Sequence, residues 1–284
     1  MSSGLWGSMQ ASGAGRVAAL SLAGLLASAG LPAVARDGVQ VGQNSAFSRL
    51  VPAEQIESSS SLQYSQMLQQ ADEKNALAGK DHPQLKRLRA IADKIIPYSL
   101  DWNPRARGWK WEVNLIGSKQ LNAFCMPGGK IVFYTGILDQ LKLTDDEVAM
   151  IMGHEIAHAL REHARERMGK STATNIGVGL LSQVLGLGQV GQTVTNYGAQ
   201  LLTLKFGRED ESEADLVGME LAARAGFDPR AGVTLWQKMG AASKGAPPQW
   251  LSTHPSGNTR IADIEANLPK VMPLYEQALL KSAQ

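Results

Sequence analysis

The feature that most constrains this chain is His154-Glu155-Ile156-Ala157-His158, a pair of histidines four residues apart with a glutamate directly after the first. On an α-helix, residues four apart lie one turn above each other on the same face, so both imidazoles can bind a single metal ion. Glu155 lies about 100° around the helix from His154, close enough to reach a water molecule at that metal. The spacing therefore predicts a helical zinc site with a carboxylate general base.

The residues around this pattern favour a helix. Thr144 and Glu147 form a capping-box pattern at its start. Apolar residues then recur at helical spacing, which predicts that one face is packed. The final turns are polar, and Gly169 is the expected end of the helix.

A zinc site of this kind needs a third protein ligand and an open fourth position. His163 is a poor candidate, because five residues beyond His158 on a continuous helix it lies about 140° away. Glu211 and Asp215 are better placed, since they lie four residues apart in an acidic helical stretch. One carboxylate can bind the metal while the other accepts the N–H of a ligating imidazole. An acidic helix start with no metal role is the alternative.

The beginning of the chain predicts export. Arg16, an apolar stretch over residues 17–31 and Ala33-Val34-Ala35 form the three parts of a cleavable signal peptide, here residues 1–35. A retained membrane anchor is the alternative for this segment. Residues 36–51 are expected to be a flexible lead-in, and residues 52–284 to form one domain. The single cysteine, Cys125, excludes an intrachain disulfide, and the net charge of +2 carries no nucleic-acid signature.

Strand patterns directly precede the metal-site helix. Alternating apolar residues from Trp111, a run over 121–126, and Ile131 to Tyr134 after a Pro-Gly-Gly turn predict a small antiparallel sheet. The fold class is therefore α+β and mainly helical, with this sheet beside the helix. A sheet edge at this place can pair with an extended peptide, although a purely structural sheet remains the alternative.

Four motifs in order resemble the zinc metallopeptidases of the CAAX-prenyl-protease/HtpX type, and within them the soluble, exported BepA- and LoiP-like branch. The motifs are His154-Glu155-Ile156-Ala157-His158, Asn122-Ala123-Phe124 with Pro127-Gly128-Gly129, Glu211 to Asp215, and Thr253-His254-Pro255. The resemblance implies that His154, His158 and Glu211 bind one zinc ion per chain and that Glu155 is the base. It further implies that Asp215 supports a ligand and that Asn122, Ala123 and Phe124 bind substrate.

The resemblance also implies a function. The chain is expected to be a periplasmic metalloendopeptidase that cleaves misfolded or misassembled envelope proteins, with outer-membrane assembly machinery as a candidate partner. No membrane-spanning helix and no nucleic-acid partner are expected in the mature chain. A zinc-stabilised chaperone or binding module with latent proteolysis is the alternative from a different functional class.

Two features leave alternatives open. In resembling proteases the histidine equivalent to His254 can reach the metal, either as a fourth ligand that makes the enzyme latent or as a donor to the oxyanion. His254 can also simply cap the helix that follows, and Arg260 is assigned to the residues that support the ligands. Residues 171–204 hold six glycines and no charged residue. They are interpreted as a lid over the cleft, a buried helical hairpin or an interfacial membrane contact.

Overall fold

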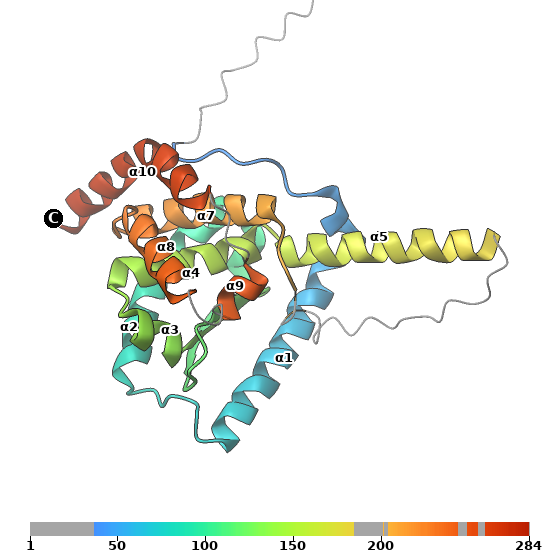
Figure 1. The fold of residues 1–284 in the computed structure, drawn as a ribbon, viewed down its shortest axis with the longest axis horizontal. Helices are drawn as coiled ribbons and strands as arrows, with labels where there is room; N and C mark the ends of the chain where they lie inside the picture. The colour runs from blue at the N-terminus through green and yellow to red at the C-terminus, as the bar shows by residue number, and fades with distance from the viewer. Residues whose placement is uncertain (1–36, 185–200, 202–203, 244–248, 255–258, 284) are drawn as a thin grey trace, which may run out of the picture. The chain divides into compact units, whose positions relative to one another are not determined.

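The computed structural model describes residues 37–184, 201, 204–243, 249–254 and 259–283. For residues 175–184 it describes the backbone alone. The elements within these ranges (Figure 1) are η1 (Ala46–Leu50), α1 (Ala53–Glu73), α2 (Pro83–Ile95), η2 (Ile96–Asp101), η3 (Pro104–Gly108), β1 (Glu112–Ile116), β2 (Ala123–Met126), β3 (Lys130–Tyr134), α3 (Thr135–Leu141), α4 (Asp145–Leu160), α5 (His163–Val184), α7 (Arg208–Arg224), α8 (Ala231–Ala242), α9 (Gln249–Thr253) and α10 (Arg260–Ser282). The predicted signal peptide lies outside the described residues.

The expected α+β, mainly helical fold is confirmed, with one difference in the sheet. Strands β2 and β3 are antiparallel, as predicted, and are joined through Gly128 and Gly129, both at positive φ. Strand β1 instead pairs with β3 in parallel, which gives the order β1-β3-β2 and a mixed sheet. The reason is the connection from Gly117 to Asn122, which carries the chain past β3 before β2 begins. Strand β2 is left at an edge of the sheet.

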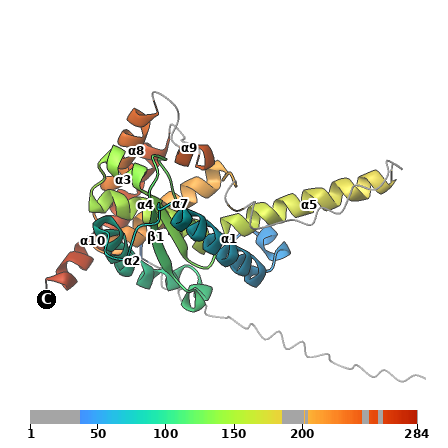
Figure 2. The ribbon, with the colours of Figure 1, turned by 90° about the horizontal axis from the view of Figure 1, so that it is seen from below.

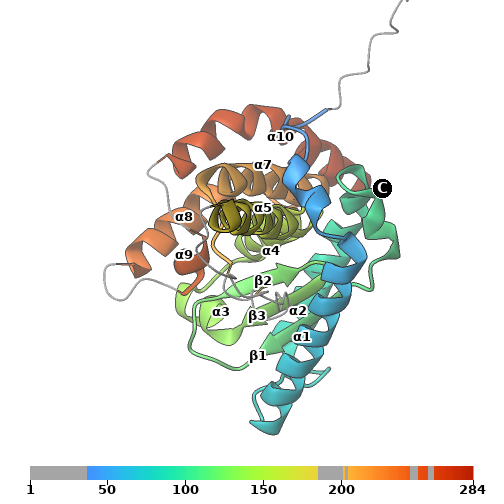
Figure 3. The ribbon, with the colours of Figure 1, turned by 90° about the vertical axis from the view of Figure 1, so that its right-hand side faces the viewer.

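Alternating side chains divide the sheet between two apolar clusters. Ile131 and Phe133 pack into the main core with α2 and α4, while Val132 packs on the opposite face with Tyr64 of α1. This is the period-two pattern of a strand covered on both faces. Figure 3 shows α10, α7, α4 and the sheet as successive layers.

Helix α4 is the central element, and it is buried along most of its length. It starts at the predicted capping box, in which the Thr144 hydroxyl accepts from the Glu147 N–H and the Glu147 carboxylate accepts from the Thr144 N–H. Its packing against α7 depends on Gly153 and Gly218. A Cβ on Gly153 would lie 2.5 Å from the Gly218 carbonyl oxygen, so only glycine permits this approach. The contact lies immediately beside His154.

The end of α4 was predicted wrongly. The helix ends at Leu160, nine residues before the expected end at Gly169, because Glu162 adopts a φ of 59° and breaks the helix. Helix α5 then starts at His163 and runs outward past η1 (Figures 1 and 2). Gly169 lies inside α5, where a Cβ would collide with the Phe47 carbonyl oxygen.

The segment from Asp37 to Val51 contacts other parts of the fold at several points. Val39 and Val51 are buried, and the Val39 N–H donates to the buried Glu220 carboxylate at 2.8 Å. Arg161 also donates to the Gly42 carbonyl oxygen. Apolar side chains at spaced positions and backbone hydrogen bonds therefore hold this segment, despite its glycine and serine content.

Two further sequence expectations concern membranes and the glycine-rich stretch. Among the described residues, no helix is both long and apolar enough to cross a membrane. Residues 185–200 and 202–203 lie outside the described residues, so the lid, hairpin and membrane-contact interpretations of 171–204 stay predictions.

Candidate active site

Helix α4 supplies His154, Glu155 and His158, and all three side chains are buried. The Nε2 atoms of His154 and His158 are 3.1 Å apart, as expected for two imidazoles one turn apart on one face. Burial lowers the pKa of His158 well below its usual value, which favours the neutral imidazole that binds metal ions.

Glu211 and Asp215, both on helix α7, face different atoms of the two histidines. The Glu211 carboxylate faces both histidines, with Oε2 3.6 Å from His154 Nε2 and Oε1 3.4 Å from His158 Nε2. Asp215 lies on the other side of His154 and contacts its Nδ1 at 3.0 Å. Glu211 is therefore placed to bind a metal, and Asp215 to orient a ligand.

Both carboxylates are held ionised. Burial alone would raise the pKa of Glu211, but its hydrogen bonds with His158 and His254 keep that pKa well below its usual value. Burial would likewise raise the pKa of Asp215, and the positive charge of Arg260 outweighs it. Arg260 is itself buried and donates to Asp215 Oδ1 at 2.5 Å and to Glu211 Oε2 at 2.7 Å.

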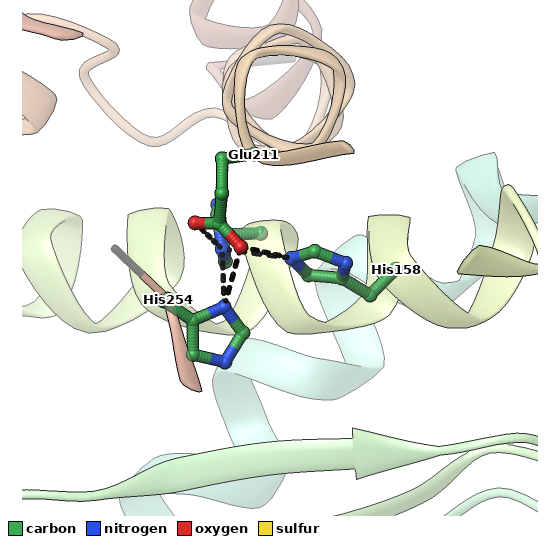
Figure 4. Close-up of side chains that lie close together, drawn as sticks. His158, Glu211 and His254 are labelled. Atoms are coloured by element: carbon green, nitrogen blue, oxygen red, sulfur yellow. Dashed lines mark hydrogen bonds and ion pairs between the residues drawn. The ribbon is translucent and has the colours of Figure 1, made fainter. Parts of the chain in front are cut away.

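His254 joins the same cluster from the loop after α9. Figure 4 shows Glu211, His158 and His254 pointing toward one another. His254 Nδ1 lies 3.0 Å from Glu211 Oε1 and 3.3 Å from His154 Nε2, while its Nε2 lies 3.5 Å from Glu155 Oε1. Both ring nitrogens face site residues, so the side chain does not act as a cap of α10.

The cluster is compatible with a bound metal ion. One atom from each of His154, His158, Glu211 and His254 lies within 4.8 Å of the others. Donors at about 2.0–2.1 Å from a tetrahedral metal stand roughly 3.3–3.4 Å apart. The neighbouring donor pairs measured above span 3.0–3.6 Å. Three imidazoles and one carboxylate are a donor set for a divalent cation.

The electrostatics of His254 agree with a cation at this place. Burial would lower the pKa of His254, but the negative charges of Glu155 and Glu211 outweigh burial and raise it. The two carboxylates therefore stabilise a positive charge beside them, on a protonated His254 or on a metal ion.

Trp250, which the sequence did not single out, holds the general-base candidate. Its indole Nε1 donates to Glu155 Oε1 at 2.5 Å, and its ring stacks on His254 with centroids 4.9 Å apart. The backbone N–H of Trp250 also donates to the Leu121 carbonyl oxygen at 3.0 Å, and this hydrogen bond joins α9 to the segment before β2. Nothing in the sequence marks this residue, because its contacts arise only when α9 folds against α4.

A cavity of about 280 Å³ opens beside the cluster. Asn122, Ala123 and Phe124, the predicted substrate residues at the edge strand β2, all line it, together with Glu155 and His158. The remaining lining is mainly apolar and includes Met67, Met126, Tyr134, Leu201, Leu204 and Phe206. Phe206, also missed by the sequence analysis, stacks on His158 at 3.9 Å between ring centroids. Cys125 is buried, and burial raises the pKa of its thiol well above the usual value.

The sequence pattern of peptidase family M48 matches residues 82–268, a range that contains every residue of this cluster. The chain belongs to peptidase family M48. Among the described residues, the cluster of His154, His158, Glu211 and His254 could hold a metal ion.

Several curated M48 relatives share extended similarity with the chain. It is 41% identical over 153 residues to mitochondrial metalloendopeptidase OMA1 of Arabidopsis thaliana, covering 54% of this chain and 30% of the relative. It is 40% identical over 164 residues to OMA1 of Schizosaccharomyces pombe, covering 57% and 48%. It is 29% identical over 174 residues to the beta-barrel assembly-enhancing protease of Escherichia coli, covering 58% and 36%. The chain thus spans half or less of the length of each of these three relatives.

Proposed function

We propose that this chain is a zinc-dependent endopeptidase, with His154, His158 and Glu211 as the zinc ligands and Glu155 as the general base. The observation that carries the proposal is the convergence of these three donors from α4 and α7 beside a buried carboxylate. Two neutral imidazoles and one carboxylate are the ligand set of many catalytic zinc sites.

The residues divide the work of hydrolysis. When bound, zinc would act as a Lewis acid toward the scissile carbonyl and toward a water molecule. Glu155 accepts the proton of the attacking water and delivers it to the leaving amine. Trp250 holds Oε1 of Glu155 at 2.5 Å and so orients the carboxylate. An extended peptide lies in the cavity along Asn122, Ala123 and Phe124, where the edge of β2 offers backbone pairing.

His254 acts, in this proposal, as a fourth ligand that keeps basal activity low. Its donor nitrogen lies within 4.8 Å of the other three donor atoms, so a metal held by all four would offer no open position to substrate until His254 moves away. The oxyanion role would require His254 to leave this position. A closed site protects an exported protease from indiscriminate cleavage.

Export and substrate class are part of the proposal. The chain is secreted into the periplasm through cleavage after Ala35 and acts on misfolded or misassembled envelope proteins. The support is the signal-peptide pattern, the apolar cavity suited to exposed apolar segments, and similarity to a relative named for β-barrel assembly. Other relatives carry mitochondrial names, so the names of the relatives do not decide the location. The assignment to the soluble, exported branch of the CAAX-prenyl-protease/HtpX type therefore rests on the sequence motifs and the signal-peptide pattern. N-terminal sequencing of the mature protein should start at Arg36, whereas a start at Met1 on a membrane-bound product would contradict export.

A zinc-stabilised chaperone or binding module with latent proteolysis is the second candidate, favoured by the four converging donors. Casein cleavage by the wild type and by Glu155→Gln separates the two. Hydrolysis that disappears in the variant while bound zinc is retained supports the peptidase. No hydrolysis by either protein, with both protecting an unfolded client from aggregation, supports the module.

A further inference from the structure

The described structure places a fourth histidine behind the metal cluster, which itself contains three. His163 is 1% exposed, and its Nδ1 lies 2.9 Å from Nδ1 of His158, the ring nitrogen directed away from the cluster. Its Nε2 lies 3.1 Å from Oε2 of Glu213. His163 therefore contacts a proposed ligand without being one of the four converging donors.

The helix break between α4 and α5 creates this contact. On a continuous helix His163 would lie about 140° around the axis from His158, and their rings would diverge. Glu162 at a φ of 59° interrupts the helix, and His163 then begins α5 with its ring returned toward His158. A non-glycine residue in the left-handed region costs backbone energy, so the surrounding structure must hold it there.

The hydrogen-bond partners determine where the ring protons lie. A carboxylate only accepts, so His163 Nε2 must donate its proton to Glu213. Nδ1 of the neutral His163 ring is then an acceptor, and the proton shared over 2.9 Å belongs to His158 Nδ1. His158 Nε2 is left with its lone pair directed at the metal position.

The other α4 ligand is arranged in the same way by a different group. Asp215 accepts from His154 Nδ1, which leaves the lone pair of His154 Nε2 facing the cluster. Arg161 donates to Glu213 Oε1 at 2.6 Å and leaves Oε2 free for His163. Each of the two α4 histidines thus has a carboxylate that orients it. Asp215 contacts His154 directly, whereas Glu213 acts on His158 through His163.

We propose that His163 is a positioning residue that fixes the metal-binding tautomer and ring orientation of His158, through the chain Arg161–Glu213–His163–His158. This inference rests on the proposed zinc site. Partners that orient metal-ligating imidazoles typically contribute about 10–100-fold to metal affinity.

The test is zinc affinity measured by competition with a chromophoric chelator, using the full chain. His163→Leu fills the volume but removes the acceptor, whereas His163→Asn keeps an acceptor oxygen near the position of Nδ1. We expect zinc Kd to rise about 10–100-fold in His163→Leu and to stay within about threefold of wild type in His163→Asn. Visible absorption of the Co²⁺-substituted proteins should change in His163→Leu alone, which reports ligand geometry independently of activity.

The outcomes separate the two proposals. Wild-type protein that binds no zinc would refute the metal site and the role of His163 with it. Wild type that binds zinc, together with His163→Leu within threefold of it, would overturn only the positioning role. Equal loss of affinity in both variants would also overturn it, because a purely structural side chain gives no rescue by an acceptor. Thermal unfolding of the metal-free proteins confirms that each variant is folded.

Discussion

Arg260 offers the sharpest energetic test of the site, because it is a buried cation between two buried carboxylates. Its guanidinium contacts both oxygens of Asp215, at 2.5 and 2.6 Å, and Glu211 Oε2 at 2.7 Å, with 4% of the residue exposed. Arg260→Met keeps an unbranched side chain but removes the charged guanidinium, which lies over the Trp236 ring at 3.8 Å from its centroid. The change leaves two ionised groups without their cation.

The expected loss depends on whether a metal is present. Removing one partner of a buried ion pair destabilises a protein by about 3–5 kcal/mol. We expect a loss of that size in the metal-free protein, measured by urea denaturation in the presence of a chelator. With saturating zinc the metal supplies positive charge at Glu211, so the loss should fall to roughly half of that value.

Arg224→Met is the matched control. Arg224 also pairs with a buried carboxylate of α7, Glu220 at 2.7 Å, but it contacts none of the cluster residues. Its loss of stability should be the same with and without zinc. A loss in Arg260→Met that is equally large in both conditions would refute the reasoning, because it would mean that no cation compensates Glu211.

Three further predictions address latency, pH and packing. His254→Ala should retain zinc and raise basal casein cleavage, whereas a fall of more than about tenfold, some 1.4 kcal/mol, would indicate an oxyanion donor. Burial would raise the pKa of Glu147, but hydrogen bonds from Lys238, the Thr144 N–H and Thr234 lower it. Its stabilisation is therefore complete above the usual value of 4.5 and is lost as pH falls through the lowered pKa, so the difference in urea midpoint between wild type and Glu147→Gln should shrink in acid. Gly153→Ala should lower stability by about 1–3 kcal/mol and weaken zinc binding, because its Cβ would meet the α7 backbone. The open helical position Gly240→Ala should instead stabilise by about 0.5–1 kcal/mol in the same denaturation assay, and equal effects of the two would contradict the packing account.

The parts of the site that sequence could predict are those fixed within one helix. His154 and His158 share a face of α4, and Glu211 and Asp215 share a face of α7, as four-residue spacing requires. Strand β1 was likewise predicted from alternating apolar residues. In each case the period of the backbone determines which side chains meet.

The missed features depend on where the chain departs from regular structure. His163 reaches His158 only because the left-handed Glu162 ends α4 early, and charged residues that favour a helix gave no sign of that break. Trp250 lies in the short helix α9 and Phe206 in the segment before α7, and their contacts follow from tertiary packing. The parallel pairing of β1 with β3 depends on the path of a connection whose composition is equally compatible with a hairpin.

The most direct test of the account is metal stoichiometry across matched carboxylate variants of α7. Zinc content of the purified, dialysed proteins should be about one per chain in wild type and Glu213→Gln, because an amide oxygen at Glu213 still accepts from His163. Glu211→Gln should lose zinc and casein cleavage together, while Glu155→Gln should keep zinc and lose cleavage. Full zinc occupancy in Glu211→Gln, or undiminished hydrolysis in Glu155→Gln, would contradict the proposed site.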